Sequence, residues 1–592
     1  MKSERSKTFI KNYKEYLTAI SLVLIIIIGI SPILKNFSNI NTKDDYLSGF
    51  TCEYYSIKSI LQFHQFPLLS PFLNGGYPIV GYPVTSTATP WIFLFLFFGE
   101  VEGIKISLIL SIFIGTLGMF YLTKSVLKFN TPGSVFSSLL FSLCGINLTL
   151  LTEYWSHVIY SLYLLPLILA TLIKSKEKKQ FIIITSFLMF PVLSSGSIFF
   201  IIICLFLTIF SILSSISSKK EKFNFDLVKN LFIILVLTVL MSMFKILPML
   251  QLLAKNRRTI NDYNILAFYC IDFRTLLDLL VNPYRILRVA TRLYFGYIPI
   301  LFCLLSLIFY IKEMWKYGFI LLIFIILTLG PNSPIDLLKL LWKVPLYHSI
   351  MAITEYSFPI VSFLISLLSG KFLQIIDDKK KYKMLKLILL MTSLISLSAL
   401  FILYKSSLNN LFNCPKPELN AEKNFYQVMI TPKNDFSKRS FLQYKNLLNN
   451  VGTINWNTDI LLPTNVEHKF LQDSKNNFKL TLNPSYKGEA YFINPENKAR
   501  ISKVTSNLIT VNVDIKTPDK LILNQNAFPG WRCNSGSIKN YNGLLSVDIF
   551  NKGKSIVVFK FMPRSFYIGL LISLISFEIS ILYLLKAKTY KM

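Results

Sequence analysis

Long apolar runs separated by short lysine-rich segments dominate the first 404 residues. A helix of about 20 apolar residues crosses the roughly 30 Å hydrocarbon layer of a membrane. We place the predicted spans near residues 17–34, 103–123, 133–151, 157–173, 181–194, 197–215, 230–247, 294–311, 317–330, 350–370, 384–404 and 566–585. The pattern therefore predicts a polytopic α-helical membrane protein with about twelve spans.

The pattern changes between residues 405 and 565. The segments Leu508–Ile515 and Ser555–Phe561 alternate apolar and polar residues, which is typical of half-buried strands. Turn-forming pairs such as Asn542-Gly543 separate such segments. We therefore expect three parts: a multi-span membrane domain (1–404), a C-terminal extracytoplasmic β-sandwich-like domain (405–565), and a last transmembrane helix with a cytoplasmic tail (566–592).

Charge predicts how the chain is oriented. Lysine and arginine number 62 against 31 acidic residues, giving a formal net charge of +31. In a soluble chain this excess would suggest nucleic acid, but these lysines cluster between apolar runs, so we expect no nucleic-acid partner. Short lysine-rich loops stay in the cytoplasm. We therefore expect both termini to be cytoplasmic and the loop 35–102 and the segment 405–565 to lie outside.

Composition excludes several classes of protein and of site. The chain is 53% hydrophobic and 16% charged, whereas soluble domains contain about 25% charged residues. Its seven cysteines form no CxxC pair and no Cys/His ligand spacing. They therefore predict neither a disulfide framework nor a structural zinc site.

The first outer loop carries the strongest candidate chemistry. Asp44 and Asp45 directly follow the first span, and a carboxylate beside apolar walls acquires a raised pKa suited to a general base. Equally, the pair could be a solvated cap of the following helix. We assign Glu53 to an amphipathic face and not to the site. A divalent metal is compatible with paired acids, but two aspartates alone do not complete an oxygen cage, so no metal site is assigned.

The loop 248–293 is unusually basic for a predicted outer loop. Planar guanidinium groups bind phosphate oxygens with charge-assisted hydrogen bonds, so a lipid phosphate would compensate this charge. The predicted lipid-phosphate-binding residues are Arg257, Arg258, Arg274, Arg285, Arg288 and Arg292. Contacts with anionic membrane lipids would account for the same charge, and so would an error in the span count that places the loop in the cytoplasm.

Four further ionisable residues lie near predicted span ends. Glu153 and His157 lie at an outer helix end and are candidates for a second acid or for aligning an acceptor. The neighbouring aromatic residues are, at such a position, usually part of a membrane-interface belt. His348 and Glu355 flank the start of the tenth span. Ionisable groups at membrane depth usually face a cavity or a partner, so these two are also candidate acceptor-side residues.

Five segments occur in an order that resembles a known family. They are FPLLSPFLNGGYP (66–78), TPWIFLFLFFG (89–99), YFGYIPILFCLLSL (294–307), NAFPGWRCNSG (526–536) and FMPRSFYIGLLISLISF (561–577). Together with the outer-loop acid they resemble YfhO-type bacterial membrane proteins of the GT-C glycosyltransferase superfamily. The chain departs from that family at Leu69, where a tryptophan is common, and at 347–358, which lacks an arginine.

The resemblance implies an activity and a place in the cell. It implies a cytoplasmic-membrane glycosyltransferase that moves a sugar from a polyprenyl-phosphate donor to a cell-envelope glycan or glycolipid acceptor, without a soluble nucleotide. By the same resemblance Asp44 or Asp45 takes the base role. Two alternatives remain: a transporter or flippase of a lipid-linked glycan, expected to show repeated halves and broken helices, and a non-catalytic scaffold for envelope assembly.

Overall fold

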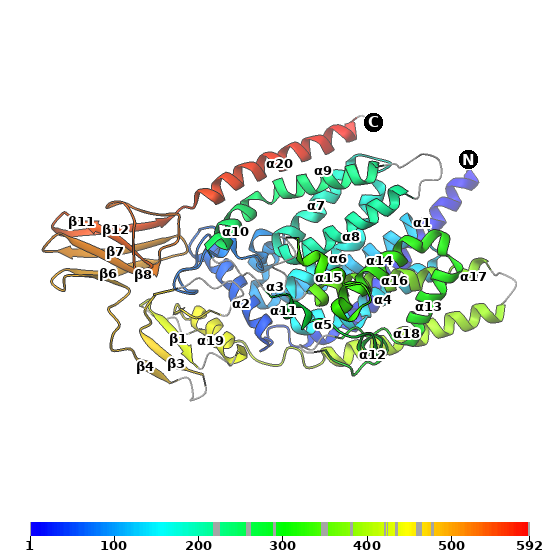
Figure 1. Cartoon of the computed structure of the whole chain (residues 1–592), viewed down its shortest axis with the longest axis horizontal. Coiled ribbons are helices and arrows are strands. Elements are labelled where there is room, and N and C mark those ends of the chain that lie inside the picture. Colours follow the sequence, from blue (N-terminus) through cyan, green and yellow to red (C-terminus); the bar gives the residue numbers. More distant parts are fainter. Residues whose placement is uncertain are drawn as a thin grey trace.

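The structure is a computed structural model of the chain, and it describes residues 2–216, 225–255, 262–287, 292–344, 353–378, 383–419, 422, 424–431, 436–456, 464–474 and 479–589. A body of helices forms one end of the molecule and the β-sheets form the other (Figure 1). The chain is a multi-pass α-helical membrane protein with a C-terminal β-rich region, as the sequence predicts.

Helices fill the first two thirds of the chain. They are α1 (Lys2–Lys35), α2 (Asp44–Ile57), α3 (Ile92–Tyr121), α4 (Thr131–Leu143), α5 (Gly145–Glu153), α6 (Ser156–Lys174), α7 (Gln180–Ser195), α8 (Ser197–Ile216), α9 (Asp226–Met241), α10 (Met243–Lys255), α11 (Tyr263–Ala267), α12 (Phe273–Val281), α13 (Tyr297–Phe309), α14 (Ile311–Leu329), α15 (Leu337–Trp342), α16 (Ile353–Phe372), α17 (Ile375–Asp378) and α18 (Lys383–Leu408). Two more, α19 (Phe436–Leu448) and α20 (Arg564–Thr589), accompany the strands.

Within the described residues, nine helical segments are long and apolar enough to cross a membrane. The helices α9 and α10 form a further pair that is bent by 75°, and α7 and α13 are shorter apolar helices. Together these account for the about twelve predicted spans. The structure differs in detail where the sequence predicts one straight span at 230–247, because the chain turns sharply at Ser242 between α9 and α10.

Lys105 fixes the point where the first span ends. Its side chain is fully buried in α3, and its Nζ donates to the carbonyl oxygens of Asn36, Phe37 and Asn39, each at 2.7 Å. These three residues follow Lys35, the last residue of α1, and a cation at a helix C-terminus favours the helix dipole. One lysine therefore holds together the turn with which the first loop starts.

Three sheets make up the region 427–561, here called the β-rich domain. Its strands are β1 (Gln427–Thr431), β2 (Gly452–Thr453), β3 (Phe470–Asp473), β4 (Leu480–Leu482), β5 (Ala490–Phe492), β6 (Lys498–Val504), β7 (Leu508–Ile515), β8 (Asp519–Asn526), β9 (Trp531–Cys533), β10 (Lys539–Tyr541), β11 (Leu544–Ile549) and β12 (Gly553–Phe561). The sheet orders are β2-β1-β3-β4, β10-β11-β8-β5 and β6-β7-β12-β9.

Two of these sheets form the predicted sandwich. Both are antiparallel, and residues of β7, β8, β11 and β12 share one hydrophobic core, for example Val511, Leu523, Val547 and Val557. The third sheet is different because β1 pairs in parallel with both β2 and β3. The sequence pattern does not indicate this sheet, since its strands are only two to five residues long.

The first loop, residues 36–91, lies between the helices and the β-rich domain. Ser70 and Tyr77 pair with each other, and Leu73 pairs in parallel with Thr453 of β2. Gly75 and Gly76 have φ angles of +66° and +102°, which side chains with a Cβ rarely adopt. The carbonyl of Gly75 accepts from the backbone N–H of Asn526 at 2.7 Å. The turn at Gly75-Gly76 is thus a docking element for the β-rich domain.

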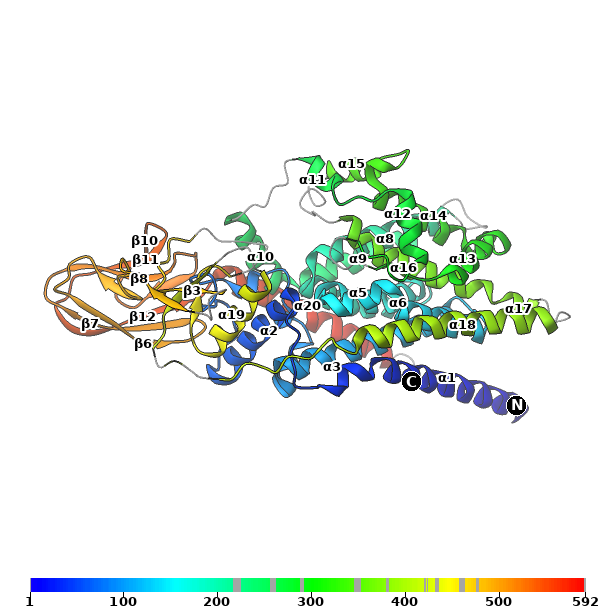
Figure 2. The ribbon, with the colours of Figure 1, turned by 90° about the horizontal axis from the view of Figure 1, so that it is seen from below.

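The two ends of the chain lie away from the sheets. From the sheets, α20 runs back beside α9 and α10, and the N-terminal half of α1 lies at the far end of the helices (Figures 1 and 2). With the lysine distribution, this arrangement predicts that the β-rich domain is outside and both termini are cytoplasmic.

We expect reporter fusions to show this orientation. A reporter active only in the cytoplasm should work when fused after Met592 and fail when inserted after Asn551, an exposed position between β11 and β12. The reverse result, or activity at both positions, would overturn the orientation.

Glu489 should make the β-rich domain sensitive to pH. Its carboxylate is buried and accepts hydrogen bonds from Tyr486, Asn524 and the N–H of Gln427, yet burial outweighs them and raises its pKa to about 7. The folded state therefore holds a proton that the unfolded state releases near pH 4.5, so the free energy of unfolding should fall as pH rises from about 4.5 to 7. Thermal unfolding of Glu489→Gln should lose part of this pH dependence; an unchanged profile would contradict the assignment.

Candidate active site

A cavity of about 220 Å³ opens where α2, the α5–α6 turn and α16 meet. Water occupies about 30 Å³ per molecule in the liquid, so the cavity holds several waters or part of a larger polar group. Its lining is rich in groups that donate or accept protons: Asp45, Ser48, Cys52, Glu53, Tyr82, Tyr154, Trp155, Ser156, His157 and Tyr356. It is the candidate active site.

The structure separates the two predicted catalytic aspartates. Both lie in the first turn of α2, where acidic side chains favour the helix dipole. Neighbouring residues of a helix point in different directions. Asp45 is exposed and borders the cavity, whereas Asp44 accepts a hydrogen bond from the Ser440 hydroxyl of α19. Of the pair, Asp45 therefore borders the cavity, and Asp44 contacts the β-rich domain.

Glu53 is a cavity residue that the sequence pattern did not single out. It follows Asp45 by eight residues, about two helical turns, so both side chains can lie on the same side of α2. Glu53 is 3% exposed; its Oε1 accepts from the N–H of Ser86 at 3.2 Å, and its Oε2 has no partner among the described residues. The four-residue spacing of Asp45, Gly49 and Glu53 was the signal that could have indicated it.

The surroundings of Glu53 give it a pKa suited to proton transfer. Burial raises the pKa of its carboxyl to about 7, while the Ser86 hydrogen bonds and the Lys245 charge oppose the rise. Lys245 is itself buried at the start of α10, and its Nζ donates to the carbonyl of Tyr82, another cavity residue. The bend between α9 and α10 thus brings a cation to the acidic side of the cavity.

Aromatic and imidazole groups form the opposite wall. His157 Nε2 lies 3.2 Å from the Tyr356 hydroxyl, so α6 and α16 meet through a hydrogen bond at the cavity. Tyr154 stacks on Tyr46 of α2 with ring centroids 4.6 Å apart, and the Tyr46 hydroxyl donates to the Leu151 carbonyl at 2.6 Å. These contacts hold the α5–α6 turn against α2.

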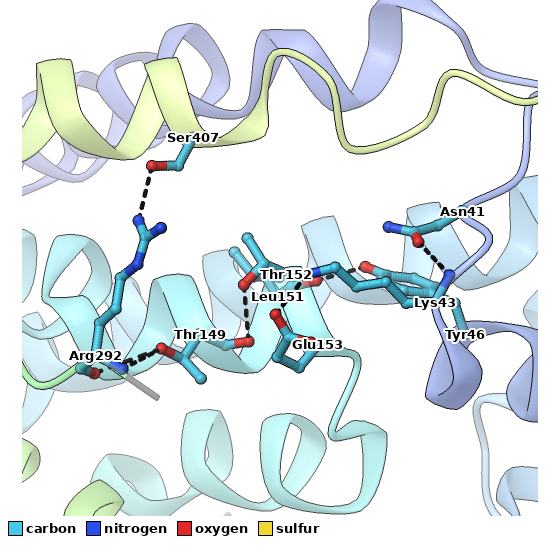
Figure 3. Close-up of polar contacts among 9 residues, drawn as sticks. All are labelled: Asn41, Lys43, Tyr46, Thr149, Leu151, Thr152, Glu153, Arg292 and Ser407. Carbon is cyan, nitrogen blue, oxygen red and sulfur yellow. Dashed lines mark hydrogen bonds and ion pairs between the residues drawn. The ribbon is translucent and has the colours of Figure 1, made fainter. Parts of the chain in front are cut away.

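Glu153 and Arg292 belong to a row of polar contacts that links the start of α2, α5 and α18 (Figure 3). Glu153 forms an ion pair with Lys43, the residue before α2. The guanidinium of Arg292 donates to the Ser407 hydroxyl of α18 at 3.2 Å, and its backbone N–H donates to the Thr149 hydroxyl at 2.8 Å. In this arrangement both side chains tie neighbouring segments together. Neither lines the cavity.

The three predicted arginines that the structure describes, Arg274, Arg285 and Arg292, do not line the cavity with the acids. Arg274 and Arg285 line a separate hollow of about 710 Å³ along α12, where Arg285 also pairs with Asp278 at 3.3 Å. Their binding of a lipid phosphate stays a prediction.

The remaining candidate residues are placed as follows. Arg257, Arg258, Arg288 and His348 lie outside the described residues. Glu355 is buried in the first turn of α16, next to Tyr356. Among the residues that the structure describes, no group of three or more His, Cys, Asp or Glu stands where it could hold a metal ion.

No family model and no curated relative matches the chain. Among solved structures, it is similar to the arabinofuranosyltransferase AftD from Mycobacteria (12% identity, TM-score 0.45, 71% of this chain and 31% of that one). It is also similar to the oligosaccharyltransferase AglB from Archaeoglobus fulgidus, solved with an inhibitory peptide and a dolichol-phosphate (12% identity, TM-score 0.48, 76% of this chain and 65% of that one). A third similar structure is ArnT from Cupriavidus metallidurans, solved with undecaprenyl phosphate (8% identity, TM-score 0.45, 74% of this chain and 89% of that one).

The chain spans about a third of the length of AftD and 65% of AglB. Every TM-score is below 0.5.

Gly49 should be required for the shape of the cavity. A Cβ at this position would lie 2.2 Å from the Tyr154 ring, so Gly49→Ala must push Tyr154 away from α2. Overpacking of this kind costs about 1–3 kcal/mol. Thermal unfolding of the full-length protein in detergent should show a clear loss for Gly49→Ala and little change for Ser48→Ala, the matched control on the neighbouring position. Equal stabilities would contradict the close packing.

Proposed function

We propose that the chain is a membrane glycosyltransferase that moves a sugar from a polyprenyl-phosphate carrier to an extracytoplasmic glycan or glycolipid acceptor of the cell envelope. The observation that carries the proposal is the cavity where α2, the α5–α6 turn and α16 meet, which has two carboxylates in different surroundings. Asp45 is exposed at its edge, and Glu53 is buried with a pKa near 7.

Glu53 is the better candidate for the general base. A base works best when its pKa lies near the pH of the reaction, and the pKa of about 7 fits that requirement. Glu53 would accept the proton of the acceptor hydroxyl while that oxygen attacks the anomeric carbon. The bond from that carbon to the phosphate oxygen breaks, and the polyprenyl phosphate leaves with the electron pair. A direct displacement of this kind inverts the anomeric carbon.

The remaining cavity residues would hold the reacting groups. Asp45 can accept hydrogen bonds from hydroxyl groups of a sugar that enters from solvent. His157 and Tyr356 offer donors and acceptors on the opposite wall. The arginines of the loop 248–293 remain the predicted contacts for the donor phosphate, and the involvement of a divalent metal remains an expectation that chelation during the assay would test.

A lipid-linked glycan transporter is the second candidate, and the bent helix pair α9–α10 favours it. Broken helices with ionisable groups at the break are typical of transporter binding sites, and Lys245 lies three residues after Ser242 at the 75° bend. A transporter moves its substrate without breaking the sugar–phosphate bond. Release of free polyprenyl phosphate therefore separates the two functions.

We expect Glu53→Gln to reduce sugar transfer by about 10²–10⁴-fold, the range that general-base catalysis contributes. Asp45→Asn should also reduce transfer, whereas Asp44→Asn is the matched control because Asp44 faces Ser440. The measurement is release of polyprenyl phosphate by membranes that contain equal amounts of each variant. Parental rates for both Glu53→Gln and Asp45→Asn would exclude this site and favour the transporter.

The pH profile tests the same group independently. Because burial raises the pKa of Glu53, the carboxyl keeps its proton below about pH 7 and is an effective base only above it. Transfer should therefore rise as pH increases through about 7. A rise that persists unchanged in the residual activity of Glu53→Gln would assign the ionisation to another group.

A further inference from the structure

A second hollow, of about 580 Å³, lies where the β-rich domain meets the last span and α10. Two of the segments that stand out in the sequence, 526–536 and 561–577, form it together, and neither serves the cavity around Glu53. Trp531 and Arg532 come from β9, Arg564 and Ser565 from the first turn of α20, and Gln251 from α10. Three distant parts of the chain therefore converge on one site.

Backbone and side-chain contacts within the protein fix the shape of this hollow. The N–H of Met562 donates to the carbonyl of Gly530 at 2.7 Å, which joins the turn before β9 to the chain entering α20. The Ser565 hydroxyl donates to Gln251 Oε1 at 2.6 Å. Trp531 pairs in register with Phe561, and their rings meet edge to face at 5.5 Å.

The groups around the hollow are mainly cations and hydrogen-bond donors. Arg532 and Arg564 are exposed, and α20 begins here with the unpaired N–H groups of a helix N-terminus. The Trp531 side chain is 7% exposed, and its Nε1 has no partner among the described residues. A buried indole N–H without an acceptor is unfavourable. None of the described residues that line the hollow is acidic.

The position of the hollow indicates which kind of anion it would meet. Arg564 is the first residue of the candidate span Arg564–Lys586, so the two arginines lie at the level where this helix enters the membrane. Lipid headgroups at that level carry phosphate, and guanidinium groups bind phosphate oxygens through paired, charge-assisted hydrogen bonds.

We propose that the hollow between β9, α10 and the start of α20 binds the phosphate headgroup of a membrane lipid on the side of the β-rich domain. Arg532 and Arg564 supply the charge, and the Trp531 indole supplies a buried donor. The ligand class is a lipid phosphate, either the monoester of a polyprenyl carrier or the diester of a phospholipid. This binding does not require the transfer reaction, so a failure of either proposal leaves the other intact.

The test is native mass spectrometry of the purified full-length protein in detergent. The probes are undecaprenyl phosphate, phosphatidylglycerol, and diacylglycerol as the lipid without phosphate. We expect binding of one or both phosphate lipids and not of diacylglycerol. Binding of undecaprenyl phosphate alone would identify a carrier site, and binding of both would identify a general headgroup site. Equal retention of diacylglycerol would overturn the proposal.

Two pairs of substitutions distinguish lipid binding at this hollow from general attraction to positive charge on the protein. Arg532→Ala with Arg564→Ala should weaken phosphate-lipid binding about tenfold or more, because two charge-assisted contacts are lost. Lys498→Ala with Arg500→Ala removes the same charge from exposed positions of β6 and should leave binding unchanged. Equal weakening by both pairs, or none by the first, would overturn the proposal.

Trp531→Phe keeps an aromatic ring but removes the indole N–H, so it should weaken binding less than the arginine pair does. Thermal unfolding confirms that each variant is folded before its binding is compared. Unchanged binding by a folded Trp531→Phe protein would exclude the indole as a ligand donor and overturn that part of the assignment.

Discussion

The first loop must satisfy its backbone hydrogen bonds although it is enclosed between the helices and the β-rich domain. A buried polar group without a partner costs about 1–3 kcal/mol. Many residues of this loop are buried, so their backbone groups need partners within the protein. The β-rich domain supplies partners: Thr453 exchanges backbone hydrogen bonds with Phe72 and Asn74, and the N–H of Asn526 donates to the carbonyl of Gly75. Asn507 adds side-chain contacts with Leu68 and Leu69. The loop that carries the candidate acids therefore depends on the domain that covers it.

A second set of contacts links α19 to the membrane helices. The Tyr444 hydroxyl donates to Glu100 of α3 at 2.5 Å, and Lys416 pairs with the same carboxylate at 2.5 Å. On the same helix, Ser440 donates to Asp44. Because α19 packs along α2, these bonds set the rotation of α2 about its axis. That rotation brings Asp45 and Glu53, and not Asp44, to the cavity.

The sequence predicts those features that follow from regular periodicity. Apolar runs indicate the spans, and the alternation in 508–515 and 555–561 indicates the sandwich. Features made by tertiary contact are not predictable in this way. The short parallel strand β2 exists only through its partners, and the bend at Ser242 lies inside an apolar run with no proline or glycine at the break.

The candidate site shows the same division between local and tertiary information. The first outer loop is predicted as the place of the acids, because two carboxylates directly after a span are visible in the sequence. The sequence pattern places Glu53 on an amphipathic face, since burial by Tyr82, Tyr154 and the 85–88 turn requires residues that are distant along the chain. The basic loop is likewise visible in the sequence. In the structure, however, Arg274 lines a hollow along α12, whereas Arg292 donates to the Ser407 hydroxyl.

The acidity of Glu53 is therefore a property of the folded loop and not of α2 alone. Ser86 donates its N–H to Glu53 Oε1, and this bond lowers the pKa that burial raises. The turn around Ser86 is held by the Thr87 hydroxyl, which bonds with Ser56 of α2 at 2.6 Å and with Thr85 at 2.7 Å. If the turn moved away while the carboxyl stayed buried, the pKa would rise further and the carboxyl would be protonated at neutral pH. The hydrogen bond between this turn and α2 thus keeps the acid in the range where it can exchange a proton.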